Sequence, residues 1–147
     1  MKAMDQVTVT FTSRSANEGF ARACAACFAA QLDPTLDEVA DVKTAVSEAV
    51  TNAIVHAYPD CLGKITMRLR LFEGGVVEIQ VKDSGVGIPD VDQARTPLFT
   101  TGGEERSGMG FTIMESFMDG LKVRSAPGKG TTVTMRKRIA RRAGGPK

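Results

Sequence analysis

Only three cysteines and one histidine occur among the 147 residues, and no apolar run approaches the roughly 20 residues needed to cross a bilayer. An odd cysteine count without framework spacing argues against a secreted, disulfide-stabilised fold. Cys24 and Cys27 form a CxxC, but no second CxxC follows and His56 is far away in the sequence. We therefore expect two small buried thiols on an apolar helix face. Residues 1–12 alternate polar and apolar and lack a signal peptide's apolar block, which predicts a cytoplasmic protein.

Positive charge is concentrated at the C-terminus. Six of the 19 basic residues, and none of the 17 acidic ones, lie within 136–147, so the remainder carries a net charge of −4. A mildly acidic globular part is not typical of nucleic-acid-binding domains, and we expect neither nucleic acid nor a membrane as a partner. We expect a single domain over residues 1–135, which is long enough for one core, and a basic, flexible tail over 136–147.

Hydrophobic periodicity predicts an α+β fold. Alternation indicates strands at 7–11, 65–71, 77–81, 121–124 and 131–135. Helical periods indicate helices at 17–32, from about 35 to the residue before Pro59, and at 111–118. Between 84 and 110 we expect mainly an irregular loop, with a short helix near 91–95, and loops of that length are usually functional. The order β-α-α-β-β-loop-α-β-β predicts helices packed on one face of a sheet.

The second predicted helix carries an acid, an amide and an imidazole at four-residue intervals: Glu48, Asn52 and His56. On an α-helix this spacing places all three on one face, each about 6 Å further along the axis. The amide oxygen of Asn52 could ligate Mg²⁺, a hard cation that prefers oxygen. Glu48 could orient or deprotonate a hydroxyl. The spacing by itself also fits an ordinary solvated polar face.

Three glycine-containing segments follow. Residues 83–89 (DSGVGIP) come directly after a strand, where glycines let the backbone approach a ligand and Asp83 could accept a hydrogen bond from an amine. Residues 106–111 (RSGMGF) begin a predicted helix, whose free N–H groups, together with Arg106, suit a phosphate. Residues 128–131 (GKGT) fit a tight hairpin. A plain turn or loop would explain each one singly, and no Walker sequence GxxxxGK[ST] occurs.

Together and in this order, the four segments resemble the motif set of the GHKL superfamily, which includes gyrase, heat-shock chaperone, histidine kinase and mismatch-repair ATPases. The resemblance implies a Bergerat-type two-layer sandwich with a mixed, mainly antiparallel sheet, which binds ATP or ADP with Mg²⁺. It implies that Asn52 ligates the metal and that Asp83 receives the adenine amine. The further nucleotide contacts that it implies are His56, Gly85, Gly87, Ser107, Gly108, Met109, Gly110 and Thr131.

Three longer stretches closely resemble the anti-sigma-F factors of endospore-forming bacteria, and the likeness covers nearly all of residues 7–135. They are SRSANEGFAR, LDPTLDEVADVKTAVSEAVTNAIVHAY and PLFTTGGEERSGMGFTIMESFMD. The resemblance implies a homodimer that holds a sporulation sigma factor inactive and phosphorylates a serine of an anti-anti-sigma protein. It implies Glu48 as the catalytic base and Arg106 as a lid arginine that reaches the terminal phosphate. It also implies Glu18 and Arg22 as contacts to the partner proteins.

Three alternatives remain open. A general-stress anti-sigma kinase would be closely related, although the PLFTT and SGMGFTIMESFMD segments favour the sporulation type. The ATP-binding half of a histidine kinase would need a phosphoacceptor histidine on a dimerisation helix, whereas the single histidine lies in the helix of Asn52. A binding module that is merely switched by nucleotide would have no use for Glu48, because binding does not require a carboxylate one turn before the metal ligand.

Overall fold

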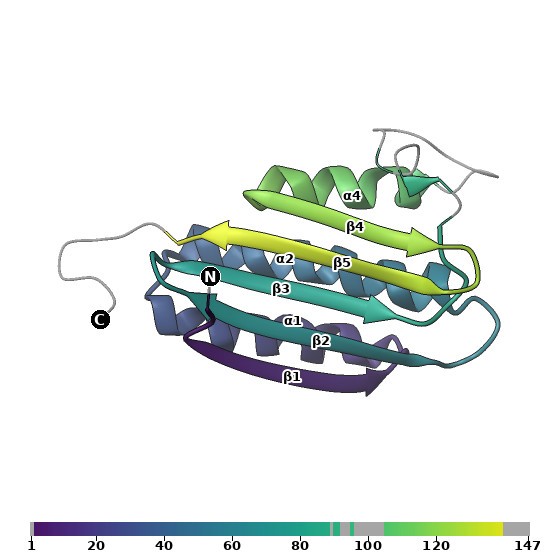
Figure 1. The fold of residues 1–147 in the computed structure, drawn as a ribbon, viewed down its shortest axis with the longest axis horizontal. Helices are drawn as coiled ribbons and strands as arrows, with labels where there is room; N and C mark the ends of the chain where they lie inside the picture. The colour runs from purple at the N-terminus through teal and green to yellow at the C-terminus, as the bar shows by residue number, and fades with distance from the viewer. Residues whose placement is uncertain (1, 89, 92–94, 96–104, 140–147) are drawn as a thin grey trace.

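The computed structural model describes residues 2–88, 90–91, 95 and 105–139, and within them a sheet is covered on one face by helices (Figure 1). The elements are β1 (Asp5–Thr12), α1 (Ala16–Ala29), α2 (Leu36–Asn52), β2 (Lys64–Phe72), β3 (Val76–Asp83), α4 (Glu105–Phe117), β4 (Gly120–Ala126) and β5 (Gly130–Arg138). This arrangement confirms the expected two-layer α+β sandwich. No helix in the described ranges is long and apolar enough to span a bilayer.

The strands of the sheet follow the order β1-β2-β3-β5-β4. Every described neighbouring pair is antiparallel, so this part of the sheet is not mixed as the superfamily resemblance implied. Alternation in β2 turns one set of side chains towards the helices, where they are almost fully buried: Ile65, Met67, Leu69 and Leu71. None of the described helices lies on the opposite face of the sheet (Figure 1).

Helix α2 crosses the middle of the sheet and carries the core. It begins with a reciprocal cap, in which the Glu38 N–H donates to Thr35 Oγ1 at 3.0 Å and the Thr35 N–H donates to Glu38 Oε1 at 2.8 Å. Its buried side chains follow the expected apolar stripe: Val42, Ala45, Val46, Ala49 and Val50. After Asn52 the α-helix gives way to a single π-helical turn, Ala53–Ala57, which we call the π-turn. Such wider turns often occur at functional sites.

Helix α1 presents a different face to the core from the one expected. Its buried residues are mainly alanines, namely Ala21, Ala25 and Ala29 together with Phe28. Cys24 is half-buried, Cys27 is exposed and Phe20 is 50% exposed, so the expectation of two buried thiols was wrong. The physical reason is that small alanine side chains let α1 lie close against α2, while Phe20 and Cys27 face outwards.

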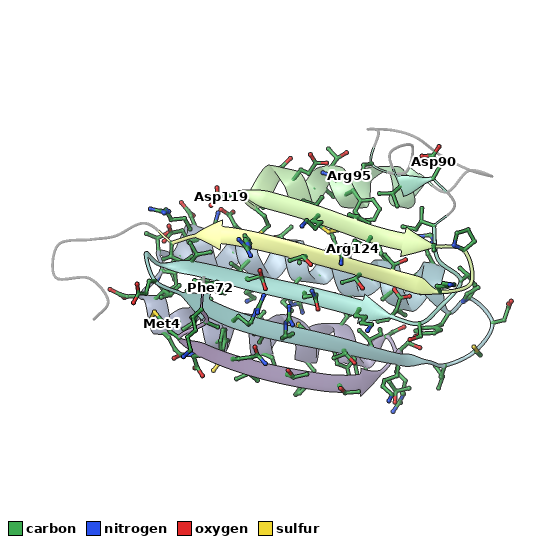
Figure 2. All side chains as sticks on the ribbon, viewed as in Figure 1. Met4, Phe72, Asp90, Arg95, Asp119 and Arg124 are labelled. Atoms are coloured by element: carbon green, nitrogen blue, oxygen red, sulfur yellow. The ribbon has the colours of Figure 1, made fainter. Side chains whose placement is uncertain are left out.

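Strand β5 continues to Arg138, three residues beyond the expected end of the domain at 135. On the open face Arg136 and Arg70 donate to the carboxylate of Glu78. Both guanidinium groups lie over the ring of Phe72, which is labelled in Figure 2. Burial by itself would raise the pKa of Glu78, but the hydrogen bonds and charges of these two arginines outweigh it and lower that pKa. Residues 140–147 lie outside the described residues, so the basic tail stays a prediction.

Candidate nucleotide site

Glu48 and Asn52 stand one turn apart on the last turns of α2, as the sequence predicted. Glu48 Oε2 and Asn52 Oδ1 are both buried, and neither has a hydrogen-bond partner among the described residues. A buried polar atom without a partner costs about 1–3 kcal/mol, so such atoms in a native fold point to a ligand. Carboxylate and amide oxygens are the donors that Mg²⁺ prefers. The donor set therefore fits the metal that the sequence implied.

The π-turn changes the position of His56, the third polar residue after Glu48 and Asn52. Because a π-helical turn is wider than an α-helical one, the four-residue spacing of one helix face ends at Asn52 and does not extend to His56. His56 is half-buried within this turn. The described residues contain no group of three or more histidine, cysteine, aspartate or glutamate side chains that could hold a metal ion. A cation at this site would therefore complete its shell with ligand oxygens or water.

Helix α4 closes the site opposite Asn52. It packs on α2, and a Cβ atom at Gly110 would lie 3.0 Å from Asn52 Nδ2 and 3.2 Å from Asn52 Oδ1. Glycine at position 110 therefore leaves room for the amide. Arg106, Ser107, Gly108 and Met109 follow Glu105 at the start of α4. Their side chains lie outside the part of the chain that the structure describes.

Asp83 ends β3 and is 6% exposed. Its Oδ1 accepts hydrogen bonds from the N–H of Gly85 at 2.9 Å and the N–H of Thr131 at 3.2 Å. Burial raises the pKa of Asp83, and these two bonds act in the opposite direction. No described residue donates to Oδ2, so the carboxylate keeps an oxygen that can accept a hydrogen bond from an amine.

Ser125 on β4 belongs to the same cluster, and sequence reasoning missed it. Its Oγ lies 2.8 Å from Thr131 Oγ1, donates to the carbonyl of Gly130 at 3.0 Å and accepts from the Ile88 N–H at 2.7 Å. The pairing of β4 with β5 places Ser125 directly opposite Thr131. No sequence signal marks Ser125, because its importance depends on strand register.

Gly85 and Gly87 are required by close packing of the backbone. A Cβ atom at Gly85 would lie 2.2 Å from the carbonyl oxygen of Ala57, which approaches from the end of the π-turn. Gly87 has φ +79°, and a Cβ atom there would lie 2.1 Å from the carbonyl oxygen of Ala126. The two glycines thus let the loop after Asp83 settle against two other segments, which fixes the loop beside the carboxylate.

The two expected partner contacts, Glu18 and Arg22, lie one turn apart on α1. The side chain of Arg22 is 41% exposed and forms an ion pair with Glu18 at 3.1 Å. Ser47 on α2 donates to Glu18 Oε2 at 2.7 Å. Arg22 therefore lies off the buried face of the helix, and its role as a partner contact stays a prediction. Because Glu18 contacts both Ser47 and Arg22, it holds the Arg22 guanidinium in a defined position.

Comparisons with known proteins agree with this geometry. The family model for the histidine kinase-like ATPase domain matches residues 11–137. The chain is 55% identical to the anti-sigma F factor of Caldanaerobacter subterraneus over 96% of this chain and 99% of that protein. It is also 55% identical to the anti-sigma F factor of Geobacillus kaustophilus, over 93% of this chain and 94% of that protein.

Solved structures support the fold. The crystal structure of the RsbU and RsbW domains of a Mycobacterium tuberculosis protein superposes with a TM-score of 0.66 at 20% identity. The match covers 92% of this chain and 32% of that one. The histidine kinase domain of a blue-light-activated kinase from Erythrobacter litoralis superposes with a TM-score of 0.53 at 25% identity, covering 70% of this chain and 45% of that one.

Proposed function

Because the chain belongs to the anti-sigma F factor family, within the histidine kinase-like ATPase domains, we propose that it binds and inhibits a sigma factor and phosphorylates a serine of that factor's antagonist. The phosphoryl donor is ATP, bound with Mg²⁺. The observation that carries this proposal is the pair of buried oxygens of Glu48 and Asn52, one turn apart on α2, which have no hydrogen-bond partner in the described part of the chain. Both oxygens suit phosphoryl transfer.

In this proposal the two ends of the nucleotide are held by different elements. Asp83 accepts a hydrogen bond from the exocyclic amine of adenine, which guanine lacks at that place, while Thr131 and Ser125 support the carboxylate and its loop. Asn52 Oδ1 ligates the metal, and the glycine at 110 leaves space for that amide. Bound Mg²⁺ would neutralise phosphate charge, which is the main requirement for phosphoryl transfer.

Glu48 is the proposed base. The hydroxyl of the incoming serine gives its proton to the Glu48 carboxylate as its oxygen bonds to the terminal phosphorus, and the bond from that phosphorus to ADP breaks. A base one turn before Asn52 stands beside the phosphate end of the nucleotide, where such positioning matters. Arg106 is proposed to stabilise charge on the terminal phosphate.

The partner surface is proposed to include Arg22, whose planar guanidinium suits a carboxylate on a partner, together with Glu18. We also propose a homodimer, which the resemblance to anti-sigma F factors implies. We propose a cytoplasmic location, because the proposed partners belong to the transcription machinery. Binding of nucleic acid or membrane is not part of this function.

Co-purification tests the whole proposal. The tagged chain is recovered from its native cells, its partners are identified by mass spectrometry, and each partner is incubated with the purified chain, labelled ATP and Mg²⁺. We expect one retained sigma factor and one other protein that gains phosphate on serine. ATP binding with no transfer to any recovered protein would leave only a nucleotide-switched binding module. Absence of a sigma factor from the recovered proteins would remove the inhibitory role.

A further inference from the structure

The loop that follows Asp83 is held by its main-chain N–H groups from several directions. The Ser84 N–H donates to Tyr58 Oη at 2.7 Å, and the Gly85 N–H donates to Asp83 Oδ1 at 2.9 Å. Further along, the Val86 N–H donates to the carbonyl of Ala57 at 3.1 Å, and the Ile88 N–H donates to Ser125 Oγ at 2.7 Å. Because the anchors come from Asp83 itself, from the segment 57–58 and from β4, the loop cannot shift without breaking at least one of these bonds. Tyr58 holds its first residue.

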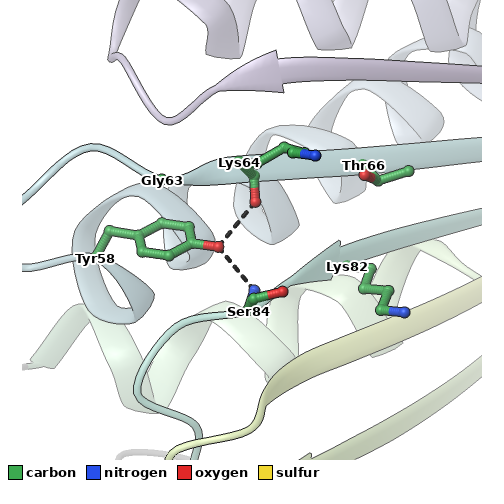
Figure 3. Close-up of a pocket in the computed structure, with 6 residues that line it drawn as sticks. All are labelled: Tyr58, Gly63, Lys64, Thr66, Lys82 and Ser84. Carbon is green, nitrogen blue, oxygen red and sulfur yellow. Dashed lines mark hydrogen bonds between the residues drawn. The ribbon is translucent and has the colours of Figure 1, made fainter.

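Tyr58 is the single tyrosine of the chain, and its hydroxyl makes two hydrogen bonds. It accepts from the Ser84 N–H and donates to the carbonyl of Lys64 at 2.8 Å, so it joins the start of β2 to the first residue after β3 (Figure 3). Its ring lies beside Gly63, where a Cβ atom would come within 2.3 Å of the ring carbon Cε1. The missing side chain at Gly63 therefore sets where the hydroxyl lies.

The same segment connects the loop to the metal end of the site. The π-turn starts directly after Asn52 and ends at Ala57, and Ala57 and Tyr58 then supply two of the four anchors. One short, widened turn therefore separates the proposed metal ligand from the residues that hold the loop of Asp83. The geometry makes the position of Asp83 relative to Asn52 depend on this turn and on the bonds that close it.

We propose that Tyr58 is a positioning residue for adenine specificity, which acts by holding the loop after Asp83 through the Ser84 N–H. This inference rests on the nucleotide site proposed above. The Tyr58 hydroxyl contacts only main-chain groups in the described structure, so it acts on the base through Asp83. The hydroxyl is needed because one atom must donate to Lys64 and accept from Ser84, and phenylalanine can do neither.

The test compares ATP and GTP affinities of the wild type and Tyr58→Phe, each measured by titration with Mg²⁺, together with melting temperatures. Loss of a hydrogen bond that orders the loop should weaken ATP binding at least about threefold. GTP gains nothing from Asp83, so its affinity should change little and the ATP-to-GTP preference should fall by the same factor. Equal weakening of both nucleotides, with the preference intact, would mean a merely structural role and would overturn the proposal.

Two further variants use the pocket of about 510 Å³ that Tyr58 lines with Gly63, Lys64, Thr66, Lys82 and Ser84 (Figure 3). Gly63→Ala keeps the hydroxyl but displaces the ring, so it should also lower the preference for ATP. Lys64→Gln alters a pocket side chain but keeps the carbonyl that Tyr58 bonds, so it should leave the preference unchanged. A loss in Lys64→Gln as large as in Tyr58→Phe would assign the effect to pocket charge and overturn the proposal.

The ATP and GTP affinities of the wild type distinguish a failure of this inference from a failure of the proposed function. A wild type that binds ATP no better than GTP would refute the role of Asp83, and the role of Tyr58 would fall with it. A clear wild-type preference for ATP that survives in Tyr58→Phe would overturn only the inference about Tyr58 and leave the nucleotide site standing.

Discussion

Glu48→Gln separates two consequences of one buried carboxylate, because glutamine keeps its shape and loses its charge. Glu48 Oε2 is buried without a partner among the described residues, so the folded protein bears the cost of that atom when no ligand is bound. Such atoms cost about 1–3 kcal/mol. Glutamine removes the charge but leaves a polar group, so the nucleotide-free variant should be more stable by about 1 kcal/mol. That corresponds to a rise of about 3 °C in melting temperature for a domain of this size.

Catalysis should change in the opposite direction. A positioned base is typically worth about 10²–10⁴ in rate, so transfer to the serine should slow at least about a hundredfold. Binding of ATP should persist, because the proposed metal ligand Asn52 is untouched. The assay is single-turnover transfer from labelled ATP to the purified antagonist, run beside an ATP titration and a thermal melt. The antagonist would then stay unphosphorylated and active, so it should relieve the inhibition of the sigma factor more readily.

Glu73→Gln is the matched control, since it makes the same substitution at an exposed residue beside the β2–β3 turn. It should leave transfer, ATP affinity and melting temperature at wild-type values. Wild-type transfer rates in Glu48→Gln would refute its role as base. A variant clearly less stable than the wild type would refute the reasoning that Oε2 is held at a cost.

Three further predictions follow from the described contacts. Asn52→Ala should lose Mg²⁺-dependent ATP binding in a titration while circular dichroism shows the fold intact, and unchanged affinity would remove the metal assignment. Arg22→Ala should weaken capture of the sigma factor or its antagonist at least about tenfold without changing ATP affinity, because a charged interface contact is lost. Glu78→Gln should cost about 2 kcal/mol in chemical denaturation at pH 7, since it leaves Arg70 and Arg136 without their carboxylate. The pKa of Glu78 is lower in the folded protein than in the unfolded chain. The ionised carboxylate therefore stabilises the fold above the unfolded-state pKa near 4.3, and this stabilisation is lost as pH falls through the folded-state pKa. The deficit of the variant should therefore shrink in acid, and a constant deficit would contradict the ionic account.

The sequence predicted what depends on local pattern. Alternation located β2 and β3, and the apolar stripe of α2 located the core. Asp83 could be placed at a strand end, and Asn52 one turn after Glu48, because both positions follow from counting residues along regular elements. These are also the positions where the chemistry of the site was expected.

What escaped prediction depends on contacts between distant segments. The π-turn has no sequence signal. Its last residue, Ala57, packs against Gly85, which follows the end of β3. Ser125 and Tyr58 act through hydrogen bonds that exist only once strands are paired. The prediction that Cys24 and Cys27 are buried in α1 was wrong, because periodicity weighs hydrophobicity and does not register how closely alanines allow two helices to approach.

The position of β5 between β3 and β4 has a consequence for the order in which the chain folds. β2 and β3 form a local hairpin, whereas the pairing of Thr12 with Lys64 and the contact of Asp83 with Thr131, 48 positions apart, both join distant parts of the chain. Closing such long loops is entropically slow, so both contacts should form after the β2–β3 hairpin. A nucleotide bound at Asp83 then stabilises a contact between strands that are distant in the sequence. We expect bound ATP to slow amide hydrogen exchange in β5 and its neighbour β4 more than in β1, because Asp83 bonds directly to the main chain of β5 and not to that of β1.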